Sequence, residues 1–215
     1  MAGSIISRAW HTLVDEGAGA FARAMVGKAY FHHRSIWFDL ALTDSMEVIR
    51  PKFDGWLDFD NTKKIYGWIE ERNVAGTNDP YEIAHMKEAG HFFVGIMNGD
   101  KIMGYMKLGW DRVYVLDYRI ELQMPPESYF VIDIFIAPEN RGLGAGPFLS
   151  SASAIEMKRR GFKRAIMHVR TDKTPMLKSG AKAGYVEIGR VDYQSILGKK
   201  VFHPHPSVFL KNLGQ

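Results

Sequence analysis

The chain mixes segments whose apolar residues recur every three to four positions with segments whose apolar residues run on continuously. The first pattern predicts amphipathic helices and the second predicts buried strands. Residues 1–31 carry the helical pattern, interrupted around Gly17 and Gly19, and we assign residues 1–34 to an N-terminal helical extension. Its basic residues would suit a membrane surface, although packing on the core or a dimer contact would use the same apolar face.

The rest of the chain predicts an alternation of strands and helices. Strands are expected at residues 35–42, on both sides of Asn98-Gly99-Asp100 between 91 and 110, and at 113–122, 129–136, 163–170, 186–191 and 201–210. Helices are expected at residues 62–72, 80–89, 147–160 and 174–183, with a loop-rich stretch before the first of them. The Asn-Gly pair predicts a tight hairpin, and 113–122 is either one strand or a hairpin arm. In the run YFVIDIFI, Asp133 is the single polar exception.

Composition restricts the kind of protein and the chemistry. With 215 residues, 46% hydrophobic and 24% charged, the chain fits one soluble domain, or one domain with an appendage. The absence of cysteine excludes disulfides, thiolate zinc sites and a cysteine nucleophile. No apolar run is long enough to span a membrane, and acidic residues stand near the start, so we expect a cytoplasmic protein.

Charge is divided unevenly along the chain. Residues 1–137 have 14 basic and 19 acidic side chains, net −5, whereas residues 138–200 have 13 basic and 5 acidic, net +8. A basic segment of this kind predicts an anionic partner. Nucleic acid is one such partner, but no known nucleic-acid-binding motif accompanies the segment, and a phosphorylated small molecule fits as well.

The most informative stretch is IAPENRGLGAGPFL, residues 136–149. Its three glycines, Gly142, Gly144 and Gly146, follow a buried strand and open a helix. Glycines there allow successive amides to point into one concavity, and the helix N-terminus adds partial positive charge, so the pattern favours phosphate binding. The alternative is a tight turn of purely structural role. A P-loop is excluded because no lysine with serine or threonine follows.

This stretch resembles the acyl-CoA-binding motif of the GNAT superfamily of N-acetyltransferases, with Arg141, Gly144 and Gly146 in the motif positions. The similarity extends to the order of elements over residues 36–210. It implies an α/β fold in residues 35–215: a mixed, mostly antiparallel central sheet, helices on both faces, and fourth and fifth strands that splay apart where they end at Ile136 and Arg170.

The resemblance also implies acetyl-CoA or coenzyme A as co-substrate and no metal. The pyrophosphate would lie on the amides of Leu143, Gly144, Ala145 and Gly146, and Gly142 in the same bend is counted with the cofactor-binding residues. Pro147 has no amide to add. Arg141 and Lys173 would meet the 3′-phosphate, and the amide of Ile134 or Ile136 would stabilise the oxyanion of the thioester. Coenzyme A is itself strongly anionic and would account for the basic segment without nucleic acid.

The chain departs from the family pattern at the expected acid and base. Gly180 stands where a tyrosine usually donates a proton to the leaving thiolate, Lys173 where an asparagine is common, and Phe130 where an acidic residue is common. Ser179, Asp133 and His168 are therefore our candidates for catalysis. Tyr129, Tyr185 and Tyr193 are alternative acids, although Tyr185 fits a core position, and Asp133 and His168 could instead be structural.

Two further segments carry possible ligands. Asp54, Asp58 and Asp60 are interleaved with Trp56 and Phe59 where the family holds its acceptor, which would suit a cationic amine, while a solvated loop is the alternative. The sequence His203-Pro204-His205-Pro206 looks like a metal site, but no third ligand is evident and we assign it to a closing loop.

Together these features predict an enzyme that moves an acetyl group from acetyl-CoA to a primary amine of a small molecule or peptide, by direct attack in a ternary complex. Two alternatives stay open: an acyl-CoA-binding protein without catalysis, and a longer-chain N-acyltransferase at a membrane surface. A homodimer is compatible with the sequence.

Overall fold

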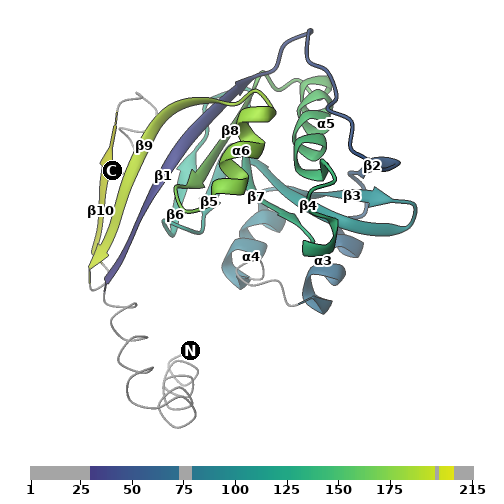
Figure 1. Cartoon of the computed structure of the whole chain (residues 1–215). Helices are drawn as coiled ribbons and strands as arrows, with labels where there is room; N and C mark the ends of the chain where they lie inside the picture. Colours follow the sequence, from purple (N-terminus) through teal and green to yellow (C-terminus); the bar gives the residue numbers. More distant parts are fainter. Residues whose placement is uncertain (1–29, 73–78, 197–198, 206–215) are drawn as a thin grey trace.

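The computed structural model describes residues 30–72, 79–196 and 199–205. Its centre is an eight-stranded sheet in the order β10-β9-β1-β8-β7-β4-β3-β2 (Figure 1). The strands are β1 (Tyr30–Ala41), β2 (Gly55–Asp58), β3 (Phe92–Asn98), β4 (Lys101–Trp110), β7 (Ser128–Ile136), β8 (Arg164–Arg170), β9 (Val186–Ile196) and β10 (Lys199–Pro204). A separate hairpin is formed by β5 (Arg112–Val115) and β6 (Ile120–Gln123).

The sheet has a fork between β7 and β8. These strands form the parallel pair of the sheet, whereas its other described pairs are antiparallel. Their register runs from Ser128↔Arg164 to Val131↔Met167 and then stops, although both strands continue. The expectation of a mixed, mostly antiparallel sheet with two splayed strands is therefore confirmed.

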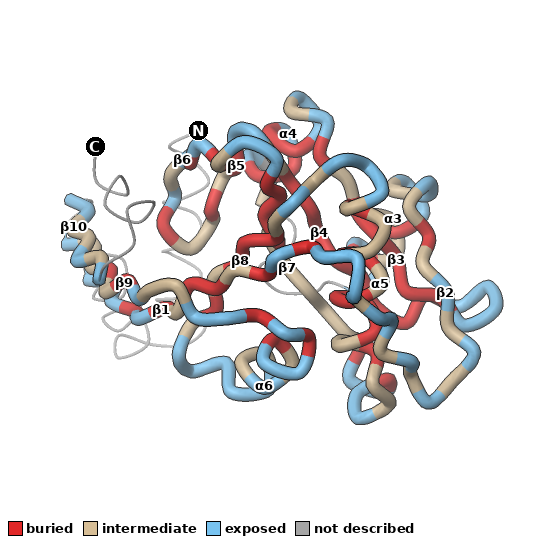
Figure 2. The backbone as a smooth tube through the Cα atoms, turned by 90° about the horizontal axis from the view of Figure 1, so that it is seen from above, coloured by how far each residue is buried: buried red, intermediate tan, exposed pale blue. Residues whose placement is uncertain are grey.

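Helices cover both faces, as expected. They are α3 (Thr62–Glu71), α4 (Pro80–Glu88), α5 (Ala145–Arg159) and α6 (Thr174–Lys182), with a short 3-10 turn, η1, at Pro138–Asn140. Figure 2 shows α6 on one side of the strip formed by β1 and β8 and the β5–β6 hairpin on the other. The core of the α5 face includes Phe148, Leu149 and Met157, and the core under α3 and α4 includes Ile65, Ile69 and Met86. No helix in the described ranges is long and apolar enough to cross a membrane.

The first strand differs from its prediction in length and place. It begins at Tyr30 rather than residue 35, so residues 30–34 of the expected helical extension are strand, and residues 1–29 lie outside the described ranges. β1 pairs antiparallel with both β8 and β9, inserted between them. β1 thus has a partner strand on each edge, and the layers that cover the two faces of the sheet bury its side chains Trp37, Phe38 and Leu40.

Local sequence accounts for most element ends. The Asp79 carboxylate accepts from the amides of Tyr81 and Glu82 and so caps α4. Gly99, at φ +55°, lies in the two-residue turn between Asn98 and Lys101, as the Asn-Gly signal predicted.

Two details were missed or left open by the sequence. β2 lies in the stretch expected to be loop, and residues 113–122 prove to be a complete hairpin. The closing strand expected at 201–210 is seen as β10, while residues 206–215, including Pro206, lie outside the described ranges.

Candidate active site

A cavity of about 430 Å³ opens where β7 and β8 part. Its walls are formed by the two diverging strands, the β5–β6 turn, and residues that lead into α5 and α6. The lining residues are Asp117, Val131, Ile132, Asp133, Ile134, Arg141, Met167, His168, Val169, Arg170, Lys173 and Met176. Of the residues expected from the sequence to act at the site, the fork thus brings together Asp133, Ile134, Arg141, His168 and Lys173.

A bulge adjusts β7 at the fork. The register with β4 shifts between Lys107 and Leu108, so that Ile132 has no partner of its own while Asp133 pairs with Lys107. Bulges redirect side chains and are frequent beside functional sites. Here the bulge coincides with the first β7 residue beyond the pairing with β8.

The glycine-rich bend connects η1 to α5. Gly142 and Gly144 have φ of +79° and +80°, a region that residues with a Cβ avoid, and Gly144 is the N-cap of α5. Among the described residues, no protein acceptor receives a hydrogen bond from the amides of residues 143–146. The Leu143 carbonyl instead accepts from the Lys52 amide at 2.8 Å, which holds the bend from outside. The bend therefore keeps donors available at the N-terminus of a 15-residue helix.

Arg141 and Lys173 bring positive charge to the cavity. The Arg141 Nε donates to the Ile136 carbonyl at 3.0 Å, and its guanidinium lies 6.0 Å from the centre of the Phe135 ring. Lys173 is the N-cap residue of α6. In the described structure neither Arg141 nor Lys173 forms an ion pair, whereas Arg170 on the same wall is paired with Asp172 at 2.7 Å.

Asp133 is held by a tyrosine on the neighbouring strand. The Tyr105 hydroxyl donates to Asp133 Oδ2 at 2.7 Å, and Tyr105 is fully buried. Lys107, the cross-strand partner of Asp133, points its ammonium to Glu82 on α4 at 2.6 Å in a buried ion pair. Burial raises the pKa of Glu82, and the charge and hydrogen bond of Lys107 only partly oppose this. Asp133 thus lies at the edge of a buried polar network that reaches the cavity.

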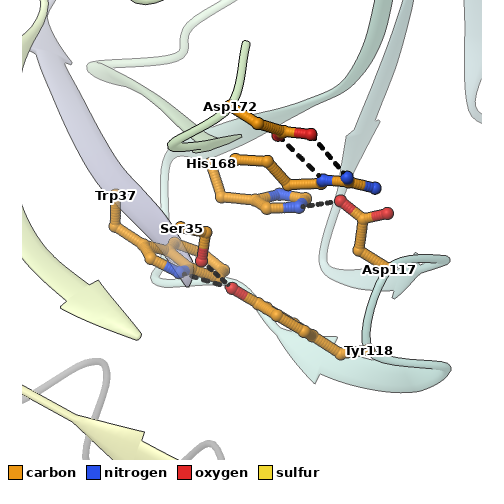
Figure 3. A network of polar contacts seen from close by, with 7 residues as sticks. Ser35, Trp37, Asp117, Tyr118, His168 and Asp172 are labelled. Atoms are coloured by element: carbon orange, nitrogen blue, oxygen red, sulfur yellow. Dashed lines mark hydrogen bonds and ion pairs between the residues drawn. The ribbon is translucent and has the colours of Figure 1, made fainter. Parts of the chain in front are cut away.

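His168 forms a pair with a carboxylate that the sequence did not indicate. Its Nε2 lies 3.1 Å from Asp117 Oδ2, from the turn of the β5–β6 hairpin (Figure 3). The imidazole is stacked on Trp37 and on Phe130, with ring centres at 5.4 and 5.8 Å. The Asp–Tyr–Arg sequence at residues 117–119 suits a turn, but nothing in it indicates a contact with a histidine 51 positions later.

The remaining expected acids lie elsewhere. The Ser179 hydroxyl faces Gly146, where an added Cβ would be 3.0 Å away, and Ser179 does not line the cavity. Tyr129, Tyr185 and Tyr193 are at most 6% exposed, and the expectation of a core position for Tyr185 is confirmed. At Gly180 an added Cβ would lie 2.5 Å from the terminal methyl of Met167, which would have to move to admit a larger residue at this position.

The acidic segment expected over the acceptor has a local structural role at one position. Asp58 is 4% exposed, and its Oδ1 accepts from the amides of Asp60 and Asn61 ahead of α3. Trp56 is 49% exposed on β2. His203 and Pro204 end β10, and the described residues contain no group of three or more potential metal ligands.

A forked α/β sheet with a glycine-rich bend at the start of the helix after the fork is the architecture of an acetyltransferase. The model of the acetyltransferase (GNAT) family matches residues 47–185. The chain therefore belongs to the GNAT family. A search of curated proteins found no match.

Solved structures agree on the fold. A GCN5-related N-acetyltransferase from Sphaerobacter thermophilus aligns with a TM-score of 0.53 and 15% identity, over 90% of this chain and 59% of that one. A GNAT-family acetyltransferase from Colwellia psychrerythraea aligns with a TM-score of 0.54 and 12% identity, over 77% and 56%. A Drosophila protein aligns with a TM-score of 0.55 and 11% identity, over 84% and 58%. This chain thus spans less than two thirds of the length of these structures, and such identities show the fold alone.

Proposed function

We propose that the protein transfers an acetyl group from acetyl-CoA to a primary amine by direct attack in a ternary complex. The amine nitrogen forms a bond to the thioester carbonyl carbon, and the carbon–sulfur bond breaks. The nitrogen loses a proton to a base, and coenzyme A leaves as a thiolate that takes up a proton. The absence of cysteine from the chain disfavours an acyl-enzyme intermediate.

The observation that supports this proposal most directly is the set of uncommitted amides in residues 143–146 beside the fork. Amides at a helix N-terminus bind phosphate oxygens through both hydrogen bonds and the helix dipole. In the proposed complex the pyrophosphate lies on this bend, Arg141 and Lys173 face phosphate oxygens, and the pantetheine arm enters the cavity. The Ile134 amide, on the cavity wall, is then our donor to the thioester oxygen.

Asp133 is our first candidate for the base. It lies on the cavity wall, and its Oδ2 is oriented by the Tyr105 hydroxyl. A base must reach the attacking amine, and a carboxylate on the fork wall is positioned to do so. Ser179, packed against Gly146, would act only through a relay that reaches the departing thiolate.

A non-catalytic acyl-CoA-binding protein is the second candidate function. It is favoured by Gly180, because glycine lacks the hydroxyl that the tyrosine common in the family at this position would supply. Such a protein would bind acetyl-CoA without releasing thiol on addition of amines.

Acetyl-CoA binding can be tested by thermal denaturation. At 100 times its dissociation constant a ligand stabilises the folded state by about 2.7 kcal/mol, which corresponds to a melting-temperature rise of roughly 5–10 °C for a chain of this size. We expect that rise for the wild type and its loss in Gly144→Glu, because the substitution brings a carboxylate into the bend.

The matched control for this experiment is Gly161→Glu. Gly161 follows the other end of α5 and also has a positive φ, of +98°, with open space around an added Cβ. Both variants carry the backbone penalty of a non-glycine residue at positive φ, about 1–2 kcal/mol. Equal ligand-induced shifts in the two variants would place the phosphates away from the bend, and no shift in the wild type would refute acetyl-CoA binding. Thiol release over an amine panel then separates enzyme from binding protein.

A further inference from the structure

The β5–β6 hairpin brings an acidic side chain to the fork cavity. Its apolar residues Val113, Val115 and Leu122 pack with Trp37 and Phe130 of the large sheet. The hairpin is thereby fixed on the sheet face that also holds His168.

Tyr118 fixes the tip of this hairpin. Its side chain is fully buried, and its hydroxyl accepts from Trp37 Nε1 at 3.1 Å and hydrogen-bonds Ser35 (Figure 3). Its preceding neighbour Asp117 has a side chain that is 34% exposed and lines the cavity. A locked tyrosine thus holds a carboxylate that remains accessible from the cavity.

The contact with His168 sets the chemical state of both partners. An ionised carboxylate only accepts, so Nε2 of His168 carries a proton and donates it to Asp117. His168 Nδ1 is buried and has no hydrogen-bond partner among the described residues. Neither nitrogen is therefore placed to take a proton from a substrate, and His168 is a positioning residue for Asp117.

Asp117 is suited to bind a cation rather than to act as a base. Burial alone would raise its pKa, but the hydrogen bond from His168 and the positive charge of neighbouring residues, Arg170 among them, outweigh burial and lower the pKa overall. The carboxylate therefore stays ionised at neutral pH. Among the described contacts His168 engages only Oδ2 of Asp117. When a substrate fills the cavity and removes water, the other carboxylate oxygen needs a donor from the substrate, and an ammonium group supplies one together with a positive charge.

We propose that Asp117 recognises a second cationic group of the acceptor, which makes the substrate a diamine or a larger polycationic amine. This rests on the proposed function, in which Asp133 serves the amine that is acetylated. Both carboxylates line one cavity, Asp133 from β7 and Asp117 from the β5–β6 turn, and in this proposal each holds one nitrogen atom of the same acceptor. Arg141 and Lys173 on the same cavity serve the phosphates of the donor.

The test compares two acceptors of the same length, 1,4-diaminobutane and 1-aminopentane, in which a methyl group replaces the second ammonium. We expect the wild type to prefer the diamine in kcat/KM by about 10–100-fold, the range of a charge-assisted hydrogen bond. Asp117→Asn should raise KM for the diamine by about 10–100-fold. The kcat for the diamine, and both kcat and KM for aminopentane, should stay within about threefold of the wild-type values. His168→Phe should raise the same KM without lowering kcat, which general damage to the fold would not produce.

Two controls accompany these variants. Asp111→Asn removes the same charge at an exposed residue that directly precedes β5, accepts a hydrogen bond from Gln123 and does not line the cavity, and it should change neither constant. Asp117→Ser serves as a second removal of the carboxylate if the asparagine variant has a lowered melting temperature.

Calorimetric titration of either amine into the protein–coenzyme A complex gives a readout that needs no turnover. Loss of diamine affinity in Asp117→Asn with unchanged aminopentane affinity supports the proposal even if no thiol is released. Absence of thiol release would refute only the acetyltransferase activity. Equal binding of the two amines to the wild type, or an equal loss for both in Asp117→Asn, would overturn it.

Discussion

At the scale of single residues, the pair formed by Lys107 and Glu82 connects α4 to the middle of the sheet. Both side chains are at most 3% exposed, and the ammonium and carboxylate are 2.6 Å apart. Buried ion pairs add little net stability over an apolar pair, but removal of one partner leaves a charge without compensation. The pair also lies next to Asp133, whose charge contributes to the raised pKa of Glu82.

Lys107→Met should therefore lower the free energy of unfolding by about 3–5 kcal/mol at pH 7. Loss of the ammonium raises the pKa of Glu82 further in the folded state, so the folded protein favours the protonated acid and the deficit should shrink as the pH falls from 7 to 5. Urea denaturation at both pH values measures this. Lys101→Met, at an exposed position of the same strand, should cost less than about 0.5 kcal/mol. A deficit independent of pH would contradict the assignment to Glu82.

At the scale of elements, the fork depends on how closely β4 approaches β7. Gly104 on β4 pairs with Ile136, and a Cβ added there would lie 2.3 Å from the Phe135 carbonyl oxygen. The space between β4 and β7 at Gly104 therefore has no room for a side chain. Ile136 in turn accepts from Arg141, so the close packing of two strands supports the residue next to the bend.

Gly104→Ala should destabilise the protein by about 1–3 kcal/mol, since overpacking of a rigid site forces the backbone to shift. Gly67→Ala in α3 is the comparison, because nothing lies within 4 Å of its added Cβ and alanine favours helix, so stability should rise by about 0.5–1 kcal/mol. Chemical denaturation measures the free energy of unfolding of both variants. Unchanged or raised stability of Gly104→Ala would show that β4 and β7 can move apart without cost.

At the scale of the whole molecule, acidic and basic residues that are far apart in the sequence compensate one another. Most of the basic segment is used in ion pairs, with Arg164 on Asp39 and Lys158 on Asp44 as examples across the chain. The excess charge is thus not a uniform patch, and the cavity keeps Arg141 and Lys173 without carboxylate partners among the described residues.

Stability of the whole fold should fall in mild acid through His33. This imidazole is 6% exposed between Tyr118 and Tyr193, neither ring nitrogen has a described partner, and burial lowers its pKa to about 4 from 6.5. Between those pH values the unfolded chain binds a proton that the folded chain does not, so stability falls as the pH is lowered, by up to about 3 kcal/mol. His33→Phe should flatten the dependence, measured by urea denaturation at pH 7 and pH 5.

The control for this experiment is His203→Gln at an exposed position of β10, which should leave the slope unchanged. Part of the slope should remain in His33→Phe, because burial also lowers the pKa of His91. A slope identical to that of the wild type would show that the pKa of His33 is the same in the folded and the unfolded protein.

By itself the sequence determined the features that depend on local chemistry. The Asn-Gly turn, the cap at Asp79, the apolar run of β7 and the glycine bend are each written in a few neighbouring residues, because turns, caps and strand burial depend on short-range geometry. The family pattern added the fork and thereby the grouping of Asp133, Arg141 and Lys173 at one cavity.

Only the tertiary structure decided the features that depend on long-range pairing. The insertion of β1 between β8 and β9 and the contact of Asp117 with His168 join residues that no local pattern relates, and so does the approach of the Met167 side chain to Gly180. Strand order and side-chain contacts follow from how whole faces pack, and one carboxylate reaches the cavity because a distant hairpin is held against the sheet by Tyr118.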